Sequence, residues 1–198
     1  MSSALGMRIA FSGSHRVGKS TLVEHVADAL PRYTSVDEPY YLLEEEGYEC
    51  SEDPSLEDFE AQLERSLVAL EEGAKNVLFD RCPADILAYL LVHEDSEAFE
   101  IDDWLDRVRN AMQTLDLIVF VPIEDRDRIA LPAHEDGEHR IAVHEKLHEI
   151  LIEDALGFEV DVLTVEGDVR SRVEQVTGRE DIASRDRRSS RAKPKSNR

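Results

Sequence analysis

One stretch near the N-terminus, residues 7–21, constrains the fold of this chain more than any other. It begins with a short apolar run at 9–11 that is typical of a buried strand. The pattern Gly-x-x-x-x-Gly-Lys-Ser follows over residues 13–20. Residues 21–30 then carry apolar side chains at the spacing of one helical face. Strand, glycine loop and helix therefore stand in the order that a phosphate-binding loop requires.

Each residue type in this loop has a chemical reason. Gly13 and Gly18 allow backbone conformations that a side chain would block, so the loop N–H groups can point inward as an anion-binding nest. The following helix adds the positive end of its dipole. Lys19 can reach the β- and γ-phosphates of ATP, and the Ser20 hydroxyl can ligate Mg²⁺. The alternative is a glycine-containing turn before an ordinary helix. We expect the nucleotide to be bound by Gly13, Ser14, His15, Arg16, Val17, Gly18, Lys19, Ser20 and Thr21.

Strand and helix patterns alternate along the rest of the chain. Further strands are predicted at 34–36, 76–79, 117–121 and 162–165. Further helices are predicted at 40–48, 56–70, 83–93, 101–112, 141–156 and 169–176. The alternation predicts an α/β fold of three layers with a parallel sheet and right-handed crossovers. We expect one domain over residues 1–183, with its ligands at the carboxyl ends of the strands.

The charge distribution separates a body from a tail. Residues 1–184 contain 16 basic and 43 acidic residues, whereas residues 185–198 contain seven basic residues and one acid. The polar, basic segment 184–198 is expected to be a disordered tail. So acidic a body disfavours nucleic acid and anionic membranes as partners.

Other features bear on location and assembly. No apolar run approaches the ~18 residues of a membrane span, and the N-terminus lacks a secretory pattern. Cys50 and Cys82 have no metal-type spacing and fit a reducing cytoplasm. The histidines between 134 and 148 lack the carboxylates and cysteines of a zinc site. The chain is expected to be cytoplasmic, and both a monomer and a homodimer remain open.

Two acids and an arginine follow the second and third predicted strands. Asp80 closes an apolar run, where it can hold Mg²⁺ together with Ser20. Arg81 follows it in place of the water-activating glutamate of a mechanical ATPase, and its planar fork can grip an acceptor or a phosphoryl group. Glu38 can take the proton of an acceptor hydroxyl. The alternatives are a surface ion pair for Asp80 and Arg81 and a helix cap for Glu38.

These motifs resemble the P-loop nucleoside and nucleotide kinases, which share Glu-Pro and Asp/Glu-Arg signatures with Glu38-Pro39 and Asp80-Arg81. The run 79–89, Phe-Asp-Arg-Cys-Pro-Ala-Asp-Ile-Leu-Ala-Tyr, is more similar to a family of small AAA-labelled ATP-binding proteins. That family is related to the nicotinamide riboside kinase domain. The resemblance covers roughly residues 7–166.

The resemblance implies the strand order 2-3-1-4-5 and an arginine-bearing lid at roughly 124–140. The candidate lid arginines are Arg126, Arg128 and Arg140. No Arg-x-x-x-Arg signature is present, so which of them acts stays open, and each can equally be a surface residue.

The function predicted from these residues is ATP-dependent transfer of the γ-phosphoryl group to a small hydroxyl acceptor. The acceptor can be a nucleoside, a ribosyl compound or a nucleotide. Between residues 33 and 79 the only cations are Arg65 and Lys75, which favours a neutral acceptor over a phosphorylated one. Arg81 is left as the main cation, with Arg107 and Arg109 as possible helpers. An alternative is an ATP-binding module that signals to a protein partner. A GTPase is disfavoured because no Asn-Lys-x-Asp motif occurs.

Overall fold

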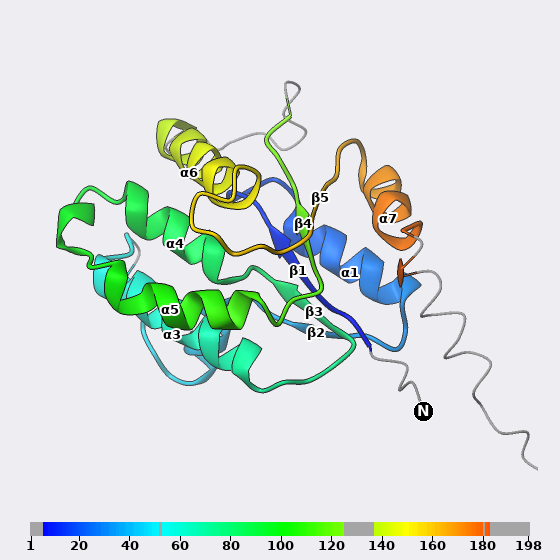
Figure 1. Ribbon diagram of the computed structural model, residues 1–198, viewed down its shortest axis with the longest axis horizontal. Helices are drawn as coiled ribbons and strands as arrows, with labels where there is room; N and C mark the ends of the chain where they lie inside the picture. Colours follow the sequence, from blue (N-terminus) through cyan, green and yellow to red (C-terminus); the bar gives the residue numbers. More distant parts are fainter. Residues whose placement is uncertain (1–5, 52, 125–136, 180, 183–198) are drawn as a thin grey trace, which may run out of the picture.

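A parallel sheet forms the centre of the computed structural model, which describes residues 6–51, 53–124, 137–179 and 181–182. Within these residues the sheet has five strands in the order β2-β3-β1-β4-β5, the predicted order. The strands are β1 (Arg8–Ser12), β2 (Thr34–Val36), β3 (Val77–Asp80), β4 (Leu117–Phe120) and β5 (Val162–Thr164). The central strand β1 lies between β3 and β4 (Figure 1).

Burial explains why the three inner strands read as continuous apolar runs. Every residue of β1, β3 and β4 is buried, since helices cover both faces of the sheet. The edge strands β2 and β5 are short and partly exposed. Ile9 of β1 is in register with Leu78 of β3 and Leu117 of β4. This register brings the carboxyl ends of β1 and β3 to one edge, where the phosphate loop begins.

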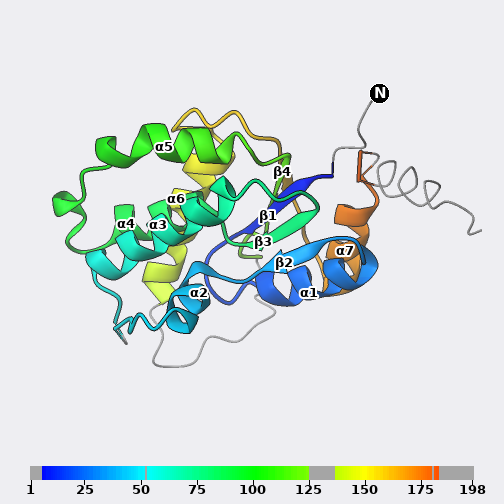
Figure 2. The same cartoon turned by 90° about the horizontal axis from the view of Figure 1, so that it is seen from below.

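Helices pack on both faces of the sheet and complete the three layers (Figures 1 and 2). One apolar core lies between the sheet and α3, α4, α5 and α6, and a second lies between the sheet, α1 and α7. The helices are α1 (Lys19–Ala29), α2 (Pro39–Glu45), α3 (Leu56–Glu71), α4 (Pro83–Val92), α5 (Asp102–Met112), α6 (Gly137–Leu151) and α7 (Val169–Thr177), with a short 3₁₀ helix, η1 (Ser96–Ala98). None of the helices in the described part of the chain is long and apolar enough to cross a membrane.

Capping residues set the starts of α3 and α4. Ser55 caps α3 and exchanges hydrogen bonds with Asp58. Cys82 and Asp85 make the same reciprocal arrangement at the start of α4, with Pro83 in the first turn. The thiols of Cys50 and Cys82 are both free.

Two helices, α2 and α6, differ from their predicted bounds by more than two residues. Helix α2 ends at Glu45 rather than at residue 48, because Gly47 takes a positive φ of 88° and turns the chain. Helix α6 begins at Gly137 and ends at Leu151 instead of spanning 141–156. Its early end is fixed by Asp154, whose φ is 51° and whose carboxylate accepts the N–H of Phe158 at 2.7 Å.

Candidate active site

The phosphate loop connects β1 to α1 through backbone conformations that favour glycine. Gly13 has a φ of 151°, and a Cβ there would lie 2.4 Å from the carbonyl oxygen of Val121. Gly18 has a φ of 86° at the N-cap of α1. Arg16 also takes a positive φ, at 55°. The loop therefore has the turn geometry that the sequence pattern predicts.

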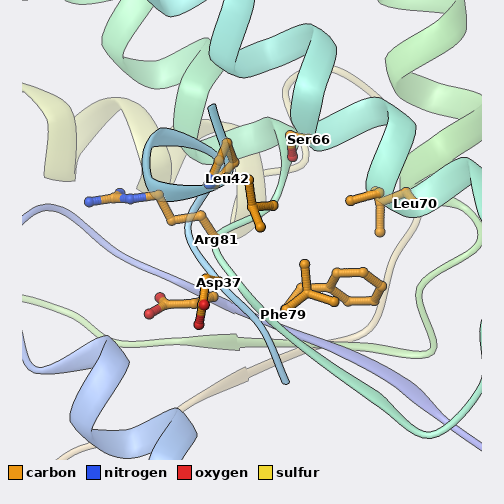
Figure 3. A pocket seen from close by; sticks show the side chains of 10 residues that line it. Asp37, Leu42, Ser66, Leu70, Phe79 and Arg81 are labelled. Carbon is orange, nitrogen blue, oxygen red and sulfur yellow. The ribbon is translucent and has the colours of Figure 1, made fainter. Parts of the chain in front are cut away.

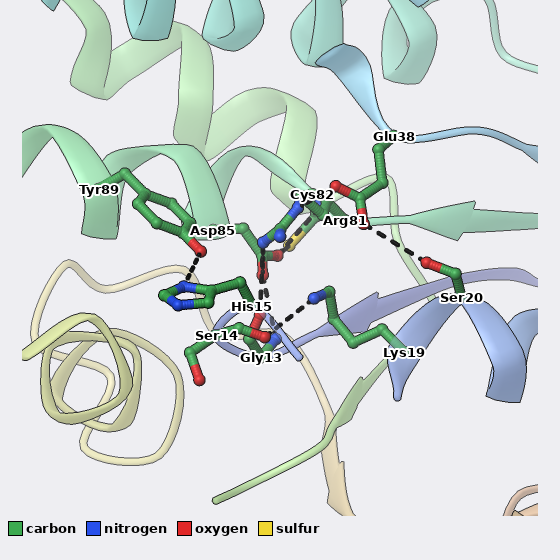
Figure 4. A network of polar contacts seen from close by, with 10 residues as sticks. All are labelled: Gly13, Ser14, His15, Lys19, Ser20, Glu38, Arg81, Cys82, Asp85 and Tyr89. Atoms are coloured by element: carbon green, nitrogen blue, oxygen red, sulfur yellow. Dashed lines mark hydrogen bonds and ion pairs between the residues drawn. The ribbon is translucent and has the colours of Figure 1, made fainter. Parts of the chain in front are cut away.

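Lys19 is buried against this loop. Its ammonium group donates to the carbonyl oxygen of Ser14 at 3.0 Å, and Figure 4 shows the side chain folded back toward the loop. Burial, followed by the charge of the nearby Arg81, lowers the pKa of Lys19 to about 8, against the opposing effect of Glu38. A bound polyphosphate would supply the negative charge that favours the protonated lysine.

Asp80 lies buried at the end of β3, next to the phosphate loop. Burial, followed by the charge of Glu38, raises the pKa of Asp80 to about 6, while the Ser20 hydroxyl lowers it. Its Oδ1 atom is buried and has no hydrogen-bond partner among the described residues. An unpartnered carboxylate oxygen beside a hydroxyl suits a hard cation with oxygen ligands. Ser20 and Asp80 therefore fit the Mg²⁺ site predicted for them.

Glu38 and Arg81 form an ion pair on the side of the loop where the sequence analysis expects the acceptor (Figure 4). The Nε atom of Arg81 donates to Oε2 of Glu38 at 2.7 Å, and the Ser20 hydroxyl lies 3.5 Å from Oε1. Burial alone would raise the pKa of the Glu38 carboxyl, but the charges of Arg81 and Lys19 outweigh it, so the pKa is lowered. Glu38 occupies the N-cap position of α2, but its side chain makes no capping hydrogen bond there. The carboxylate is therefore directed at the site and not at the helix.

Arg81 is not part of a surface ion pair, because its side chain is only 9% exposed. Its backbone has a positive φ of 78°, and its guanidinium reaches back to donate to the carbonyl oxygen of Gly13 at 3.3 Å. The guanidinium carbon also lies 5.4 Å from the ring centroid of Tyr89. Arg81 thus joins the third strand, the phosphate loop and α4 at one point.

The sequence analysis missed Asp85, which is fully buried. Its carboxylate accepts from the backbone N–H of Gly13 at 3.0 Å and from that of Cys82 at 3.1 Å. An acid three residues after Cys82, the residue that precedes the predicted helix, is the signal that could have identified Asp85. Asp85 therefore ties the start of α4 to the start of the phosphate loop.

Tyr89 is a second residue without a predicted role. Its hydroxyl lies 3.3 Å from Nδ1 of His15, and its ring stacks on Phe59 with centroids 5.4 Å apart. The side chain of His15, a residue of the phosphate loop, therefore connects that loop to α4.

A small cavity adjoins the site on the acceptor side, between β3, α2 and α3 (Figure 3). The guanidinium of Arg81 points away from the apolar end formed by Leu70 and Phe79. The cavity is partly open to solvent, and its volume of about 10 Å³ is close to the space that one water molecule needs. The lining residues are Val36, Asp37, Pro39, Leu42, Ser66, Ala69, Leu70, Phe79, Asp80 and Arg81.

The remaining candidate cations occupy different places. Arg140 is buried on α6 and donates to the carbonyl oxygens of His15 and Arg16 at 3.0 and 3.3 Å. Arg107 instead binds two glutamates of α3, and Arg109 binds Asp106 and a carbonyl oxygen before β5, so neither helps at the acceptor side. The other proposed lid arginines, Arg126 and Arg128, lie outside the described residues, as do 125–136 of the expected lid and the tail from 183.

Of the histidines considered for a zinc site, His139, His144 and His148 lie on α6, and His134 lies outside the described residues. In the described part of the chain, no group of three histidine, cysteine or acidic side chains is placed to hold a metal ion. His144 instead stacks on Phe120, with ring centroids 5.7 Å apart.

A family model described as "AAA domain" matches residues 8–172, which is most of the chain. No curated protein has a significant match to the chain. The family match agrees with the resemblance of the run 79–89.

Solved structures with the same fold include several kinases. Deoxyadenosine kinase from M. mycoides has a TM-score of 0.60 at 16% identity, over 87% of this chain and 97% of that chain. Thymidylate kinase from Candida albicans has a TM-score of 0.61 at 16% identity, over 93% of this chain and 95% of that chain. A NadR protein, solved in complex with NAD and AMP-PNP, has a TM-score of 0.62 at 18% identity, over 88% of this chain and 49% of that chain.

Proposed function

We propose that this chain, which belongs to the AAA domain family, is an ATP-dependent phosphotransferase that acts on a small hydroxyl acceptor. The observation that carries the proposal is the 2.7 Å ion pair between Glu38 and Arg81, next to Ser20 and Asp80. A nucleotide-binding loop alone serves many functions, whereas a carboxylate and a guanidinium beside the γ-phosphate position suit transfer to a hydroxyl group. Kinases among the structures of the same fold agree with this assignment.

The proposed roles follow from the positions of the side chains. The backbone N–H groups of the phosphate loop and Lys19 hold the phosphates. Ser20 and Asp80 hold Mg²⁺, which neutralises charge on the phosphate oxygens when it is bound. Arg81 lies where it can leave Glu38 and neutralise charge on the phosphoryl group during transfer.

Glu38 is proposed to orient the acceptor hydroxyl. Its lowered pKa keeps it ionised, so it accepts a hydrogen bond from the hydroxyl at neutral pH. A carboxylate of lowered pKa is a weak base, but phosphoryl transfer passes through a loose transition state and gains most from positioning. The hydroxyl proton passes to Glu38 as the acceptor oxygen forms its bond to the γ-phosphorus, while the bond from that phosphorus to the β,γ-bridging oxygen breaks and ADP leaves.

The described cations favour a neutral acceptor. Arg65 binds Glu46 at 2.8 Å, and Arg107 lies on α5, bound to Glu64 and Glu71. Arg81 pairs directly with Glu38, so its charge is already neutralised by that carboxylate. A phosphorylated acceptor would bring two further negative charges into an acidic protein, so a neutral hydroxyl compound is the better fit.

One screen tests the proposal. ATP consumption is measured with Mg²⁺ against a panel of nucleosides, ribosyl vitamins, mononucleotides and small hydroxy acids. We expect turnover to rise with one class of neutral acceptor, with formation of the phosphorylated acceptor in equal amount to ADP. Slow ATP hydrolysis that no acceptor stimulates, together with ATP-dependent assembly, would instead indicate a regulatory module.

A further inference from the structure

The carbonyl oxygens of the phosphate loop are bound by cationic side chains at five successive positions. Arg81 donates to Gly13 and Lys19 to Ser14. Arg140 donates from Nε to the carbonyl oxygen of His15 and from a terminal nitrogen to that of Arg16. Arg172 of α7 donates to the carbonyl oxygen of Val17 at 2.7 Å. The next carbonyl, of Gly18, accepts the N–H of Leu22 as part of α1.

Peptide geometry links these carbonyls to the anion site. A trans peptide is planar, and its N–H points away from its C=O. The carbonyls of His15, Arg16 and Val17 share their peptide planes with the N–H groups of Arg16, Val17 and Gly18. Fixing the three oxygens on the outer side therefore turns the three N–H groups to the inner side, where they form a nest for phosphate.

The two arginines that fix these three peptides come from elements far along the chain. Arg140 is 2% exposed on α6, and Arg172 is 7% exposed on α7. Arg172 also binds Glu124 at 2.8 Å, and the same carboxylate oxygen accepts the N–H of Gly167 at 2.8 Å. Helices from opposite faces of the sheet thus meet the loop from two sides (Figure 1).

Fold stability alone does not account for Arg172. Its Nε atom is buried and has no hydrogen-bond partner among the described residues. Burial of an unpartnered N–H costs free energy, and a buried ion pair is often no more stabilising than apolar side chains of the same size. A guanidinium at this position is explained if the orientation of the Val17 peptide is needed for binding.

We propose that Arg140 and Arg172 are positioning residues that hold the phosphate loop in its anion-binding conformation before the nucleotide arrives. The inference rests on the proposed function only in that the loop binds the phosphates of ATP. Preorganised N–H groups bind an anion without the entropic cost of ordering the loop. The role assigned to Arg140 differs from that of a lid arginine that reaches the transferring phosphoryl group.

Arginine is suited to this role by its shape. Arg140 spans two successive carbonyls with one planar guanidinium, and Arg172 joins a carbonyl to a carboxylate in the same way. An ammonium group is a point charge and does not fix two acceptors in one plane. Lysine at either position should therefore keep the positive charge but hold the loop peptides less firmly in their orientation.

The experiment compares Arg140→Met, Arg172→Met and Arg172→Lys with wild-type protein. The control is Arg170→Met, on the same helix as Arg172 but with a side chain that is 88% exposed. Binding of MgADP and of Mg²⁺-tripolyphosphate is measured by calorimetry at a temperature where every variant is folded. Tripolyphosphate has no base or sugar, so it reports on the phosphate site alone.

We expect each methionine variant to bind both probes at least about tenfold more weakly, since each loses charge-assisted hydrogen bonds to the loop. Arg172→Lys, which should fold if a methionine variant does not, should show a smaller loss, and Arg170→Met should bind as wild type does. Amide hydrogen exchange of Arg16, Val17 and Gly18 in the unliganded protein should become faster in the methionine variants. A merely structural role would lower the thermal midpoint and leave the affinity of the folded protein unchanged.

Failure of this inference and failure of the proposed function give different results. If the variants at 140 and 172 bind both probes like wild type while Lys19→Ala does not, the positioning role is overturned. If the variants lose binding as expected but no acceptor stimulates turnover, the positioning role stands and the phosphotransferase proposal fails.

Discussion

The carboxylate of Asp85 accepts a hydrogen bond from the backbone N–H of Gly13 at 3.0 Å, although the two residues are 72 positions apart. The same carboxylate caps the first turn of α4 through Cys82 and lies 3.5 Å from the guanidinium of Arg81. A single buried acid therefore fixes the first peptide of the phosphate loop relative to the helix that carries Tyr89.

Asp85→Asn should destabilise the protein by about 3 kcal/mol. The amide keeps one acceptor oxygen, so its NH₂ group would face one of the two backbone N–H groups, of Gly13 and Cys82, that now find an acceptor, and a negative charge beside the buried Arg81 would be lost. Urea unfolding measures the change. Asp106→Asn is the control, because that side chain is 96% exposed and pairs with Arg109 on the surface. A loss below about 0.5 kcal/mol, the usual effect of a surface substitution, would show that Asp85 is dispensable for the fold.

Lys19→Ala should weaken MgATP binding at least about tenfold without lowering the stability of the unliganded protein. The pKa of Lys19 is lowered to about 8, chiefly by burial, so the folded state disfavours its charged form. Removing that charge at pH 7 should leave the thermal midpoint equal or higher. Calorimetry with MgATP and a thermal scan of the free protein measure the two effects. Wild-type affinity in the variant would contradict the assignment of the phosphate loop.

The phosphate loop and the positions of the strands could be predicted because both depend on local patterns, whereas the strand order was implied by the resemblance to the P-loop kinases. The loop needs particular residues at 13, 18, 19 and 20, and buried parallel strands appear as apolar runs at regular intervals. Asp80 and Arg81 could be found for the same reason, since each directly follows such a run. The alternation of strands and helices then limits the sheet to few topologies.

The contacts of Asp85, Arg140 and Arg172 could not be predicted, because they depend on which helix meets the loop in space. Arg172 lies 155 positions from Val17, and no spacing rule connects them. The C-terminal end of α6 was misplaced because the apolar pattern continues to residue 156, whereas the helix ends at Leu151. The turn at Asp154, whose carboxylate accepts the N–H of Phe158, replaces the last predicted turn of the helix.

Histidine protonation should make stability depend on pH through His144. Burial, followed by the nearby His148 and Arg140, lowers the pKa of His144 in the folded protein. Below the ordinary histidine pKa of about 6.5 the unfolded chain therefore takes up a proton that the folded chain resists. The contribution of His144 is present above that pH and is lost as the pH falls through the folded value.

The measurement compares the pH dependence of the free energy of unfolding between pH 5 and 8 for wild type and His144→Gln. We expect a shallower fall toward acid pH in the variant, because glutamine has no proton to take up. His25→Gln, an exposed position on α1, is the control. Parallel curves for His144→Gln and wild type would show that protonation of His144 is not coupled to folding.

Glu38→Gln should lower kcat by ~10²–10⁴ while leaving the affinity for ATP nearly unchanged. The glutamine keeps the size and can still accept a hydrogen bond from Arg81, but it does not take the hydroxyl proton and holds the acceptor oxygen less strongly. Glu45→Gln is the matched control, since it changes the same residue type at an exposed position of α2. Because the substitution also removes the negative charge that pairs with the buried Arg81, unfolding is measured alongside the kinetics. Rates are compared at a temperature where both variants are folded.

A loss confined to kcat would assign Glu38 to the reacting hydroxyl, whereas a rise in the KM for ATP would assign it to the nucleotide through Ser20. Full activity of Glu38→Gln, or a mononucleotide as the best acceptor, would contradict a neutral hydroxyl acceptor oriented by Glu38.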